Sequence, residues 1–203
     1  ATEGEPLERA RAAAVLIHGR GADAASILRL AEAIDVPDCA WLAPQAAGNT
    51  WYPQRFIAPF ADNEPYLSSA LNRIGTLIGE IEAAGIPDER IALIGFSQGA
   101  CLATEYAARN ARRWGLIGGL SGGLIGPPGT PFEYPGSLDG TPVLLGCSDV
   151  DPHIPVERVH TTSAVLEALN GDVEERIYEG MGHGVNADEM AWVSDLVDDL
   201  VSE

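Results

Sequence analysis

The fold class of this chain is decided by the stretch Ile91-Ala92-Leu93-Ile94-Gly95-Phe96-Ser97-Gln98-Gly99-Ala100. An apolar run comes first, then a glycine-x-serine-x-glycine pattern, and then a run with helical character. A turn this tight strains the backbone of its central residue, and the glycines on either side avoid clashes between strand and helix. The pattern predicts that Ser97 is a nucleophile held on a rigid point, with a helix N-terminus below it.

The rest of the chain alternates short apolar runs with longer amphipathic ones. The short runs predict strands at residues 12–17, 39–43, 90–95, 116–120, 141–146 and 174–178, and the longer ones predict helices at 24–34, 66–84, 98–110, 156–169 and 187–200. Alternating elements indicate an α/β fold, with a mostly parallel central sheet covered by helices on both faces. Nothing marks a domain boundary, so we expect a single domain over residues 1–203.

Composition excludes several function classes. The formal net charge is −18, and because such a surface repels phosphate backbones we expect no nucleic-acid partner. No apolar run approaches the roughly 18 residues of a membrane span, so we expect no stable membrane insertion. Cys39, Cys101 and Cys147 are far apart and lie in apolar surroundings, which predicts buried, reduced thiols and no metal site. Reduced thiols, and residues 1–11 without the apolar core of a signal peptide, favour a cytoplasmic location.

A serine nucleophile needs a histidine base and an acid that orients it, in the order serine, acid, histidine for this class of fold. His183 lies in the flexible turn Gly180-Met181-Gly182-His183-Gly184 after the last strand, where it can reach Ser97, whereas His160 lies within a predicted helix. Two carboxylates follow the preceding strand, Asp149 and Asp151, and either of them can be the acid. Spacing alone does not separate them, since one can brace the turn while the other orients the base.

Two backbone N–H groups are expected to stabilise the oxyanion. One belongs to Gln98, the residue after the nucleophile, and the other to Arg20 in the glycine-rich turn His18-Gly19-Arg20-Gly21 after the first long strand. We predict a structural role for His18 in ordering that turn. The Arg20 side chain has two alternatives, which are contact with an anionic substrate group and exposure to solvent.

Several motifs together resemble one known family. Gly95-Phe96-Ser97-Gln98-Gly99-Ala100, His18-Gly19-x-Gly21 upstream, and Asp151-Pro152-x-x-Pro155 and Gly182-His183 downstream are similar to the phospholipase/carboxylesterase family, which includes acyl-protein thioesterases and small bacterial carboxylesterases. The resemblance implies an α/β-hydrolase fold without a large cap domain and without a cofactor. It also implies Ser97, Asp151 and His183 as the catalytic triad, with Arg20 and Gln98 as oxyanion donors.

The expected function is therefore that of a serine carboxylesterase. Long loops at residues 48–65 and 122–140 are expected to line or cover the site, and the aromatic side chains of Trp51, Tyr52, Phe56 and Phe60 are candidates for the wall of an acyl or aryl pocket. The thioesterase branch often has leucine where this chain has Arg20, which favours small, short-chain esters over acyl-protein substrates.

We expect a small-molecule ester as the partner, and the sequence is compatible with a homodimer. The alternatives are a non-catalytic ligand-binding protein on a hydrolase scaffold, and a hydrolase of another bond type, either a peptidase or a dienelactone-like enzyme. Thioesters and lysophospholipids are further substrate classes within the first prediction.

Overall fold

The apolar runs of the sequence form the strands of one sheet in the computed structural model, which describes residues 1–202. The strands are β1 (Thr2–Gly4), β2 (Ala12–Ile17), β3 (Cys39–Leu42), β4 (Ile91–Phe96), β5 (Leu116–Leu120), β6 (Pro142–Ser148) and β7 (Asp172–Tyr178). The helices are α1 (Ala24–Ile34), α2 (Phe60–Asn63), α3 (Tyr66–Ala83), α4 (Gln98–Arg109), α5 (Val156–Ala168) and α6 (Ala187–Ser202), with single 3₁₀ turns at Ala47–Asn49 and Asp88–Arg90. The prediction of an α/β fold with a mostly parallel sheet is confirmed.

The strand order is β1-β3-β2-β4-β5-β6-β7, and every neighbouring pair except β1 with β3 is parallel. The chain runs from β2 to β3 on one side, then crosses back over β2 to β4 and moves outward from there to β7 on the other side. This reversal creates a switch point between β2 and β4, and ligands of open α/β sheets bind outside the carboxyl ends of the strands at such a point. Because Ile17 pairs with Gly95, the turns that follow these two strands lie side by side.

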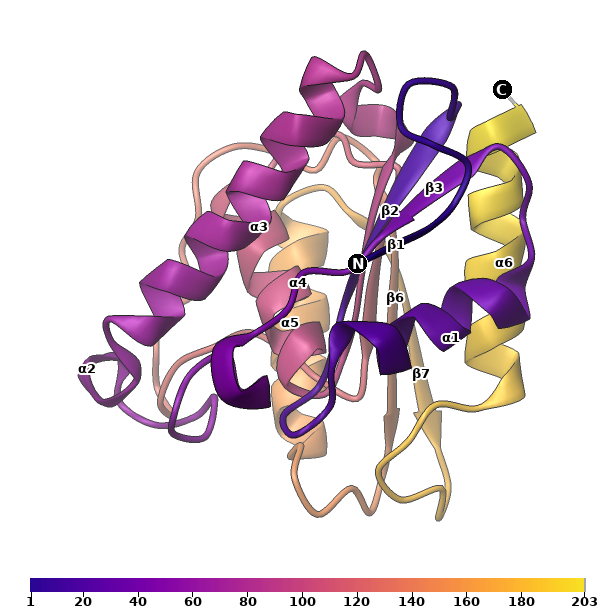
Figure 1. Ribbon diagram of the computed structural model, residues 1–203. Coiled ribbons are helices and arrows are strands. Elements are labelled where there is room, and N and C mark those ends of the chain that lie inside the picture. Colours follow the sequence, from indigo (N-terminus) through magenta and orange to yellow (C-terminus); the bar gives the residue numbers. More distant parts are fainter. Residues whose placement is uncertain (203) are drawn as a thin grey trace.

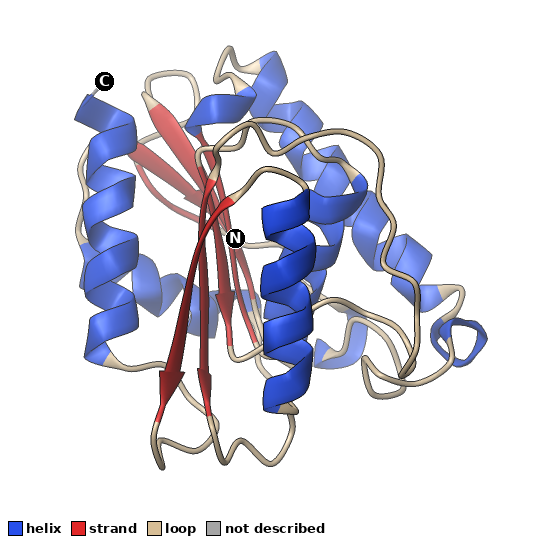
Figure 2. Cartoon of the chain, turned by 180° about the vertical axis from the view of Figure 1, so that it is seen from behind, coloured by secondary structure: helices blue, strands red, loops and turns tan. Residues whose placement is uncertain are grey.

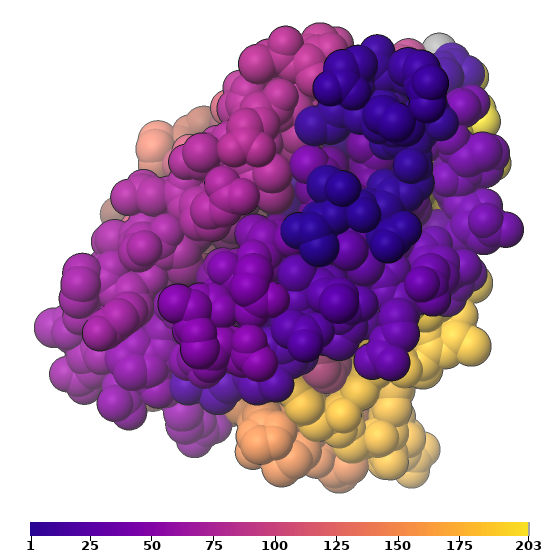
Figure 3. Space-filling model, viewed as in Figure 1, coloured from indigo at the N-terminus to yellow at the C-terminus, as the bar shows by residue number. Residues whose placement is uncertain are grey.

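Helices cover both faces of the sheet, as Figure 1 shows. On one face α3, α4 and α5 bury apolar side chains against the strands, among them Leu67, Leu102 and Val159. On the other face α1 and α6 do the same, with Ile27 and Val197 in a second core cluster. The two layers leave free the sheet edge at which the strands end, and Figure 2 shows that loops gather there. In the space-filling view of Figure 3, the orange and yellow segments that follow β6 and β7 lie side by side at this end.

Helix α1 starts where its sequence says it should. Asp23 adopts an extended conformation and accepts a hydrogen bond from the backbone N–H of Ser26, while the Ser26 hydroxyl oxygen accepts one from the N–H of Asp23. This reciprocal capping satisfies N–H groups that the first turn cannot pair internally. It also fixes the exit of the chain from the turn at residues 18–23, which belongs to the candidate site.

Strand β1 was not predicted. Its three residues are exposed and two of them are polar or charged, so no apolar pattern marks them. The strand exists because it pairs antiparallel with β3, with Glu3 opposite Trp41.

The predicted single domain extends to residue 203, which lies outside the described residues. Within residues 1–202, no helix has both the length and the apolar character needed to cross a membrane.

Candidate active site

The turn between β4 and α4 holds Ser97 in a backbone conformation that few non-glycine residues adopt, with φ 56° and ψ −118°. Its N–H donates to the carbonyl of Leu120 at 2.9 Å, which anchors the turn to β5. A Cβ atom on Gly95 would overlap the carbonyl group of Gly99, and one on Gly99 would overlap the carbonyl of Ile17. Both glycines are thus sterically required, and the hydroxyl of Ser97 stands out at the strand ends.

His183 links this hydroxyl to a carboxylate. Its Nε2 lies 2.9 Å from Ser97 Oγ, and its Nδ1 lies 2.7 Å from Asp151 Oδ2. A carboxylate only accepts hydrogen bonds, so Nδ1 carries the proton and Nε2 presents a lone pair to the hydroxyl. The structure therefore brings together a hydroxyl, an imidazole and a carboxylate from three loops, in the orientation that proton removal from Ser97 requires.

The two competing carboxylates have different partners. Burial alone would raise the pKa of Asp151, but hydrogen bonds from His183 and from the backbone N–H groups of His153 and Ile154 outweigh it, so its pKa is lowered. Asp149 instead accepts from the N–H of Gly180 at 2.8 Å. Asp149 thus braces the start of the histidine loop, and Asp151 is the carboxylate in contact with the imidazole.

The loop that carries His183 is held at several points. The hydroxyl of Ser148 accepts a hydrogen bond from the N–H of Gly182 at 3.0 Å, and the hydroxyl of Ser121 donates to the carbonyl of Gly184 at 3.1 Å. The ring of Phe96 packs against the imidazole, with centroids 5.0 Å apart. Contacts on both sides of the histidine fix the ring position that a flexible glycine-rich turn would leave open.

Two backbone N–H groups near Ser97 are free. Within residues 1–202, neither the N–H of Arg20 nor that of Gln98 donates to a protein acceptor, and Gln98 is the first residue of α4. The pairing of β2 with β4 brings the turns that contain them together. A helix N-terminus with an unpaired N–H favours negative charge, so both groups are suitably placed for an oxyanion.

His18 is buried and holds the turn after β2, in agreement with the structural role predicted for it. Its Nε2 accepts from the N–H of Ala46 at 3.2 Å, so Nδ1 carries the proton and donates to the carbonyl of Gly19 at 2.8 Å. The Trp51 ring packs on it at 4.9 Å, and its indole N–H donates to the His18 carbonyl. His160 lies away from this site and pairs with Glu175.

The Arg20 residue is exposed to solvent, as one of its two alternatives expected, but its guanidinium is held by the protein and is not free to meet a substrate. Its guanidinium donates to the carbonyls of Tyr52, Pro53 and Gln54 at 2.9, 3.0 and 2.6 Å. The side-chain amide of Gln98 binds the same segment, since it donates to the Tyr52 carbonyl at 2.9 Å and accepts from the N–H of Trp51. Both candidate oxyanion residues therefore clamp the loop that follows β3.

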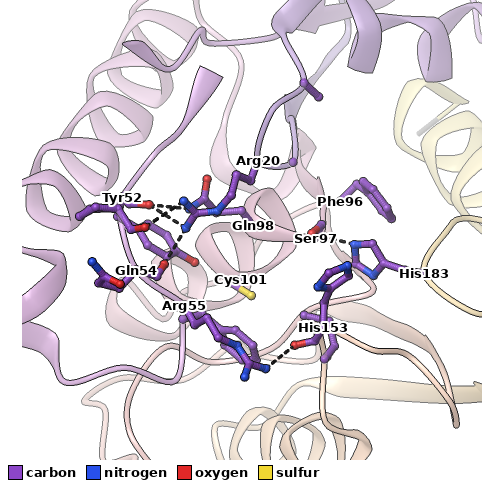
Figure 4. A pocket seen from close by; sticks show the side chains of 15 residues that line it. Arg20, Tyr52, Gln54, Arg55, Phe96, Ser97, Gln98, Cys101, His153 and His183 are labelled. Atoms are coloured by element: carbon purple, nitrogen blue, oxygen red, sulfur yellow. Dashed lines mark hydrogen bonds between the residues drawn. The ribbon is translucent and has the colours of Figure 1, made fainter. Parts of the chain in front are cut away.

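A cavity of about 420 Å³ opens above Ser97 (Figure 4), between the turn after β2 and the loops that carry His153 and His183. Of the four predicted aromatic residues, Tyr52 and Phe56 line it. Trp51 and Phe60 do not, and here the prediction needs correction. The Trp51 side chain turns away to His18 and to a neighbouring hollow, and Phe60 packs against the hydrophobic core.

Sequence reasoning assigned no individual role to four polar residues that line the cavity. Gln54 and Arg55 lie in the loop after β3, Cys101 lies in α4, and His153 follows Asp151. Burial raises the pKa of the Cys101 thiol to about 12, so this group stays neutral beside Ser97. The nearby thiol of Cys147 lies 3.8 Å from Asp151 Oδ2, and all three cysteines are buried and unpaired, as predicted. Only the proximity of Gln54 and Arg55 to the aromatic residues could have signalled a role for them.

A buried carboxyl group lies behind the histidine loop. Glu189 lies in the first turn of α6, and its Oε2 accepts from the N–H of Asn186 at 2.8 Å, while Oε1 has no hydrogen-bond partner within residues 1–202 and lies against Gly146 of β6. Burial raises its pKa to about 7, although the hydrogen bond from Asn186 opposes the shift. Among residues 1–202, no group of three histidine, cysteine or acidic side chains is arranged to hold a metal ion.

Known proteins of similar sequence and structure were found for nearly the whole chain. A family model described as Phospholipase/Carboxylesterase matches residues 4–200. The crystal structure of a phospholipase/carboxylesterase from Dyadobacter fermentans superposes with a TM-score of 0.93 at 44% identity, over 97% of this chain and 94% of that one.

Two curated sequences are also similar to this chain. Acyl-protein thioesterase 1 from Gibberella zeae is 33% identical over 109 residues, which are 53% of this chain and 46% of that protein. The protein of the same name from Saccharomyces cerevisiae is 29% identical over 136 residues, 64% of this chain and 57% of its own length. The matched region thus spans about half the length of these curated relatives.

Proposed function

Because the chain belongs to the phospholipase/carboxylesterase family, we propose that it is a serine carboxylesterase that hydrolyses small, short-chain esters through Ser97, His183 and Asp151. The observation that carries the proposal is the continuous hydrogen-bonded path from the Ser97 hydroxyl through the imidazole to the carboxylate. This path ends on a hydroxyl that lines a cavity, where an acyl group has access to it.

Acyl transfer proceeds in two steps. His183 Nε2 takes the proton of Ser97 Oγ while that oxygen attacks the ester carbonyl, and Asp151 stabilises the imidazolium that forms. The N–H groups of Arg20 and Gln98 bind the oxyanion of the tetrahedral intermediate. His183 then protonates the leaving alcohol, a water molecule attacks the acyl-enzyme with the same histidine as base, and the carboxylic acid departs as Ser97 regains its proton.

The size of the site and the aromatic rings in its wall support small substrates. The cavity of about 420 Å³ lies at the low end of the volumes that ordinary ligand sites have. Its wall includes the buried aromatic rings of Tyr52 and Phe56, which suit a short acyl or aryl group. Rates should therefore fall as the acyl chain lengthens in a series of 4-nitrophenyl esters from acetate to decanoate.

Removal of the nucleophile tests the proposal directly. Ser97→Ala should abolish hydrolysis of 4-nitrophenyl acetate and labelling by a fluorophosphonate probe, while the melting temperature stays nearly unchanged. Ser69→Ala is the matched control, since Ser69 is an exposed serine on α3 that lies outside the cavity above Ser97. If Ser97→Ala hydrolysed the ester at the same rate as Ser69→Ala, the proposal would be wrong.

Thioesters are a second candidate substrate class. The acyl-protein thioesterase relatives support it, and the chemistry differs only in that His183 protonates a thiol instead of an alcohol. Hydrolysis of a short-chain thioester of N-acetylcysteamine, compared with the oxygen ester of the same acyl group, distinguishes the two. Lysophospholipids belong in the same comparison, because a substrate with a long acyl chain should be poor if the cavity limits the size.

A further inference from the structure

The cavity above Ser97 is cationic in a strongly acidic protein. The chain has a formal net charge of −18, with 30 acidic residues against 12 basic ones. Yet among the described residues that line the cavity there are two arginines and two histidines and no carboxylate: Arg20, Arg55, His153 and His183. The side chain of Asp151, in the loop that also carries His153, is fully buried and is in contact with His183. The cavity therefore offers positive charge that the catalytic groups do not use.

The two arginines are in different states. The guanidinium of Arg20 donates hydrogen bonds to three backbone carbonyls. Arg55 donates only one hydrogen bond, from Nη2 to the carbonyl of His153 at 3.1 Å, and within residues 1–202 it forms no ion pair. Figure 4 shows this guanidinium at the cavity wall beside the His153 carbonyl. A guanidinium has five N–H donors in a fixed plane, so most of the Arg55 fork remains free to bind a carboxylate.

We propose that Arg55 forms an anion-binding subsite and that the preferred substrates are small esters that carry a carboxylate in addition to the ester group. The inference rests on the proposed esterase function and adds the charge of its substrate. The bond from Arg55 to the carbonyl of His153 ties the fork, which lines the cavity, to the loop that also carries Asp151. A carboxylate bound there fixes one end of the ester, and the reacting carbonyl then lies over Ser97 with fewer orientations to lose.

The acidity of the whole surface does not cancel this subsite. Charges farther away than a Debye length, about 8 Å at physiological salt, are largely screened, whereas a guanidinium in direct contact with its ligand is screened less. The acidic groups act on the approach of the substrate, and Arg55 acts on the bound state. For a carboxylate-bearing ester, salt should therefore change the rate at which the ester meets the protein, whereas Arg55 should change the affinity of the protein for the transition state.

The contribution of Arg55 can be measured with two pairs of esters, each made of one ester with a carboxylate and one neutral ester. One pair carries the charge on the leaving group, 4-acetoxybenzoate against its neutral methyl ester. The other carries it on the acyl group, mono-4-nitrophenyl adipate against 4-nitrophenyl hexanoate. The quantity of interest is the ratio of kcat/KM for the charged ester to kcat/KM for the neutral one, taken for the intact protein and for Arg55→Gln. Intrinsic reactivity differences between the two esters cancel when the variant is compared with the intact protein.

The proposal predicts that Arg55→Gln lowers this ratio by about tenfold in at least one pair, and that Arg55→Lys restores part of it. Whichever pair responds identifies the side of the ester that carries the charge. Arg113→Gln is the matched control, because Arg113 is exposed, lies outside the cavity and also donates one bond to a backbone carbonyl, that of Asp139, at 3.1 Å. The control should leave both ratios unchanged although it alters the net charge equally.

The subsite is overturned if the ratio stays within about twofold of the intact protein in both pairs. This holds whether the variant loses no rate or loses it equally on charged and neutral esters, and the equal loss is what a purely structural bridge to His153 would give. Either result leaves the esterase proposal standing as long as the intact protein hydrolyses the neutral esters. If the intact protein cleaves none of the four esters faster than Ser97→Ala does, the proposed function itself has failed.

Discussion

Asp151 contacts His183 through one carboxylate oxygen and the backbone of its own loop through the other. Oδ2 lies 2.7 Å from Nδ1 of His183, and Oδ1 accepts the N–H groups of His153 and Ile154 at 2.8 and 3.0 Å. The backbone of the loop thus fixes the orientation of the carboxylate, and the carboxylate fixes the orientation of the imidazole.

Replacement of Asp151 by asparagine should lower kcat for 4-nitrophenyl acetate by about 10⁴-fold. The asparagine oxygen can still accept from the two N–H groups, but its amide N–H₂ would then face Nδ1. The imidazole would move its proton to Nε2, where it cannot accept from Ser97. Asp149→Asn is the control and should retain most activity, since Asp149 contacts Gly180 and not His183. Similar losses in the two variants would contradict the assignment.

The hydrogen bonds from the Arg20 guanidinium to the loop after β3 can be tested by themselves. Arg20→Gln removes them but keeps the backbone N–H, which is the candidate oxyanion donor. The variant loses hydrogen bonds to the carbonyls of Tyr52, Pro53 and Gln54, and we expect kcat to fall by about 10- to 100-fold as the cavity wall loosens. Trypsin should also cut after Arg55 faster than in the intact protein. Arg29→Gln, on the exposed face of α1, is the control. Unchanged cleavage and unchanged kcat would show that the clamp is dispensable.

Glu189 should make stability depend on pH near neutrality. In the unfolded chain its carboxyl titrates at about the ordinary value of 4.5, whereas burial raises the pKa to about 7 in the folded protein. Its stabilising contribution is full below pH 4.5 and is lost as pH rises through 7, because the unfolded chain releases a proton that the folded protein retains. The stability difference between Glu189→Gln and the intact protein should move in favour of the variant by about 3 kcal/mol from pH 4 to pH 8.

The measurement for Glu189 is urea unfolding at several pH values. The glutamine oxygen can still accept from the N–H of Asn186, so the capping bond survives in the variant. Glu167→Gln makes the same change of charge on the exposed surface of α5, and its stability should run parallel to that of the intact protein. Parallel curves for Glu189→Gln as well would mean that the carboxyl is not held neutral.

Gly99→Ala should prevent stable folding or lower stability by more than about 3 kcal/mol, since the added Cβ would overlap the carbonyl of Ile17 across the β2–β4 pair. Gly79→Ala is the matched control. Gly79 is exposed in α3 with no atom within 4 Å of the added Cβ, so alanine there should raise stability by up to about 1 kcal/mol. Thermal melts of both variants check the prediction, which fails if Gly99→Ala melts like the control.

The sequence by itself determined the features that depend on neighbouring residues. At Gly95 the tight turn beside Ser97 follows from local sterics, since a Cβ atom there would overlap Gly99, four positions away, whereas Gly99 must be small because the carbonyl of Ile17 on β2 packs against it. The alternation of apolar and amphipathic runs likewise determined the parallel sheet and its two helical layers, because burial of one face is a property of each element. The placement of the histidine loop at the strand ends followed from that topology.

Tertiary structure alone decided the rest. Asp149 and Asp151 differ in which partner the folded chain supplies, Gly180 or His183. Arg20 meets the carbonyl of Tyr52 across 32 positions, and no local pattern encodes such a contact.

The outer strand β1 exists only because β3 offers an unpaired edge to it. The loop after β3 has no periodicity, so the direction of each aromatic ring depends on distant contacts, which turned Trp51 towards His18 and left Tyr52 and Phe56 at the cavity. Local sterics and periodicity thus set the turn, the strands and the helices, whereas the partners of loop side chains are set only when the elements pack.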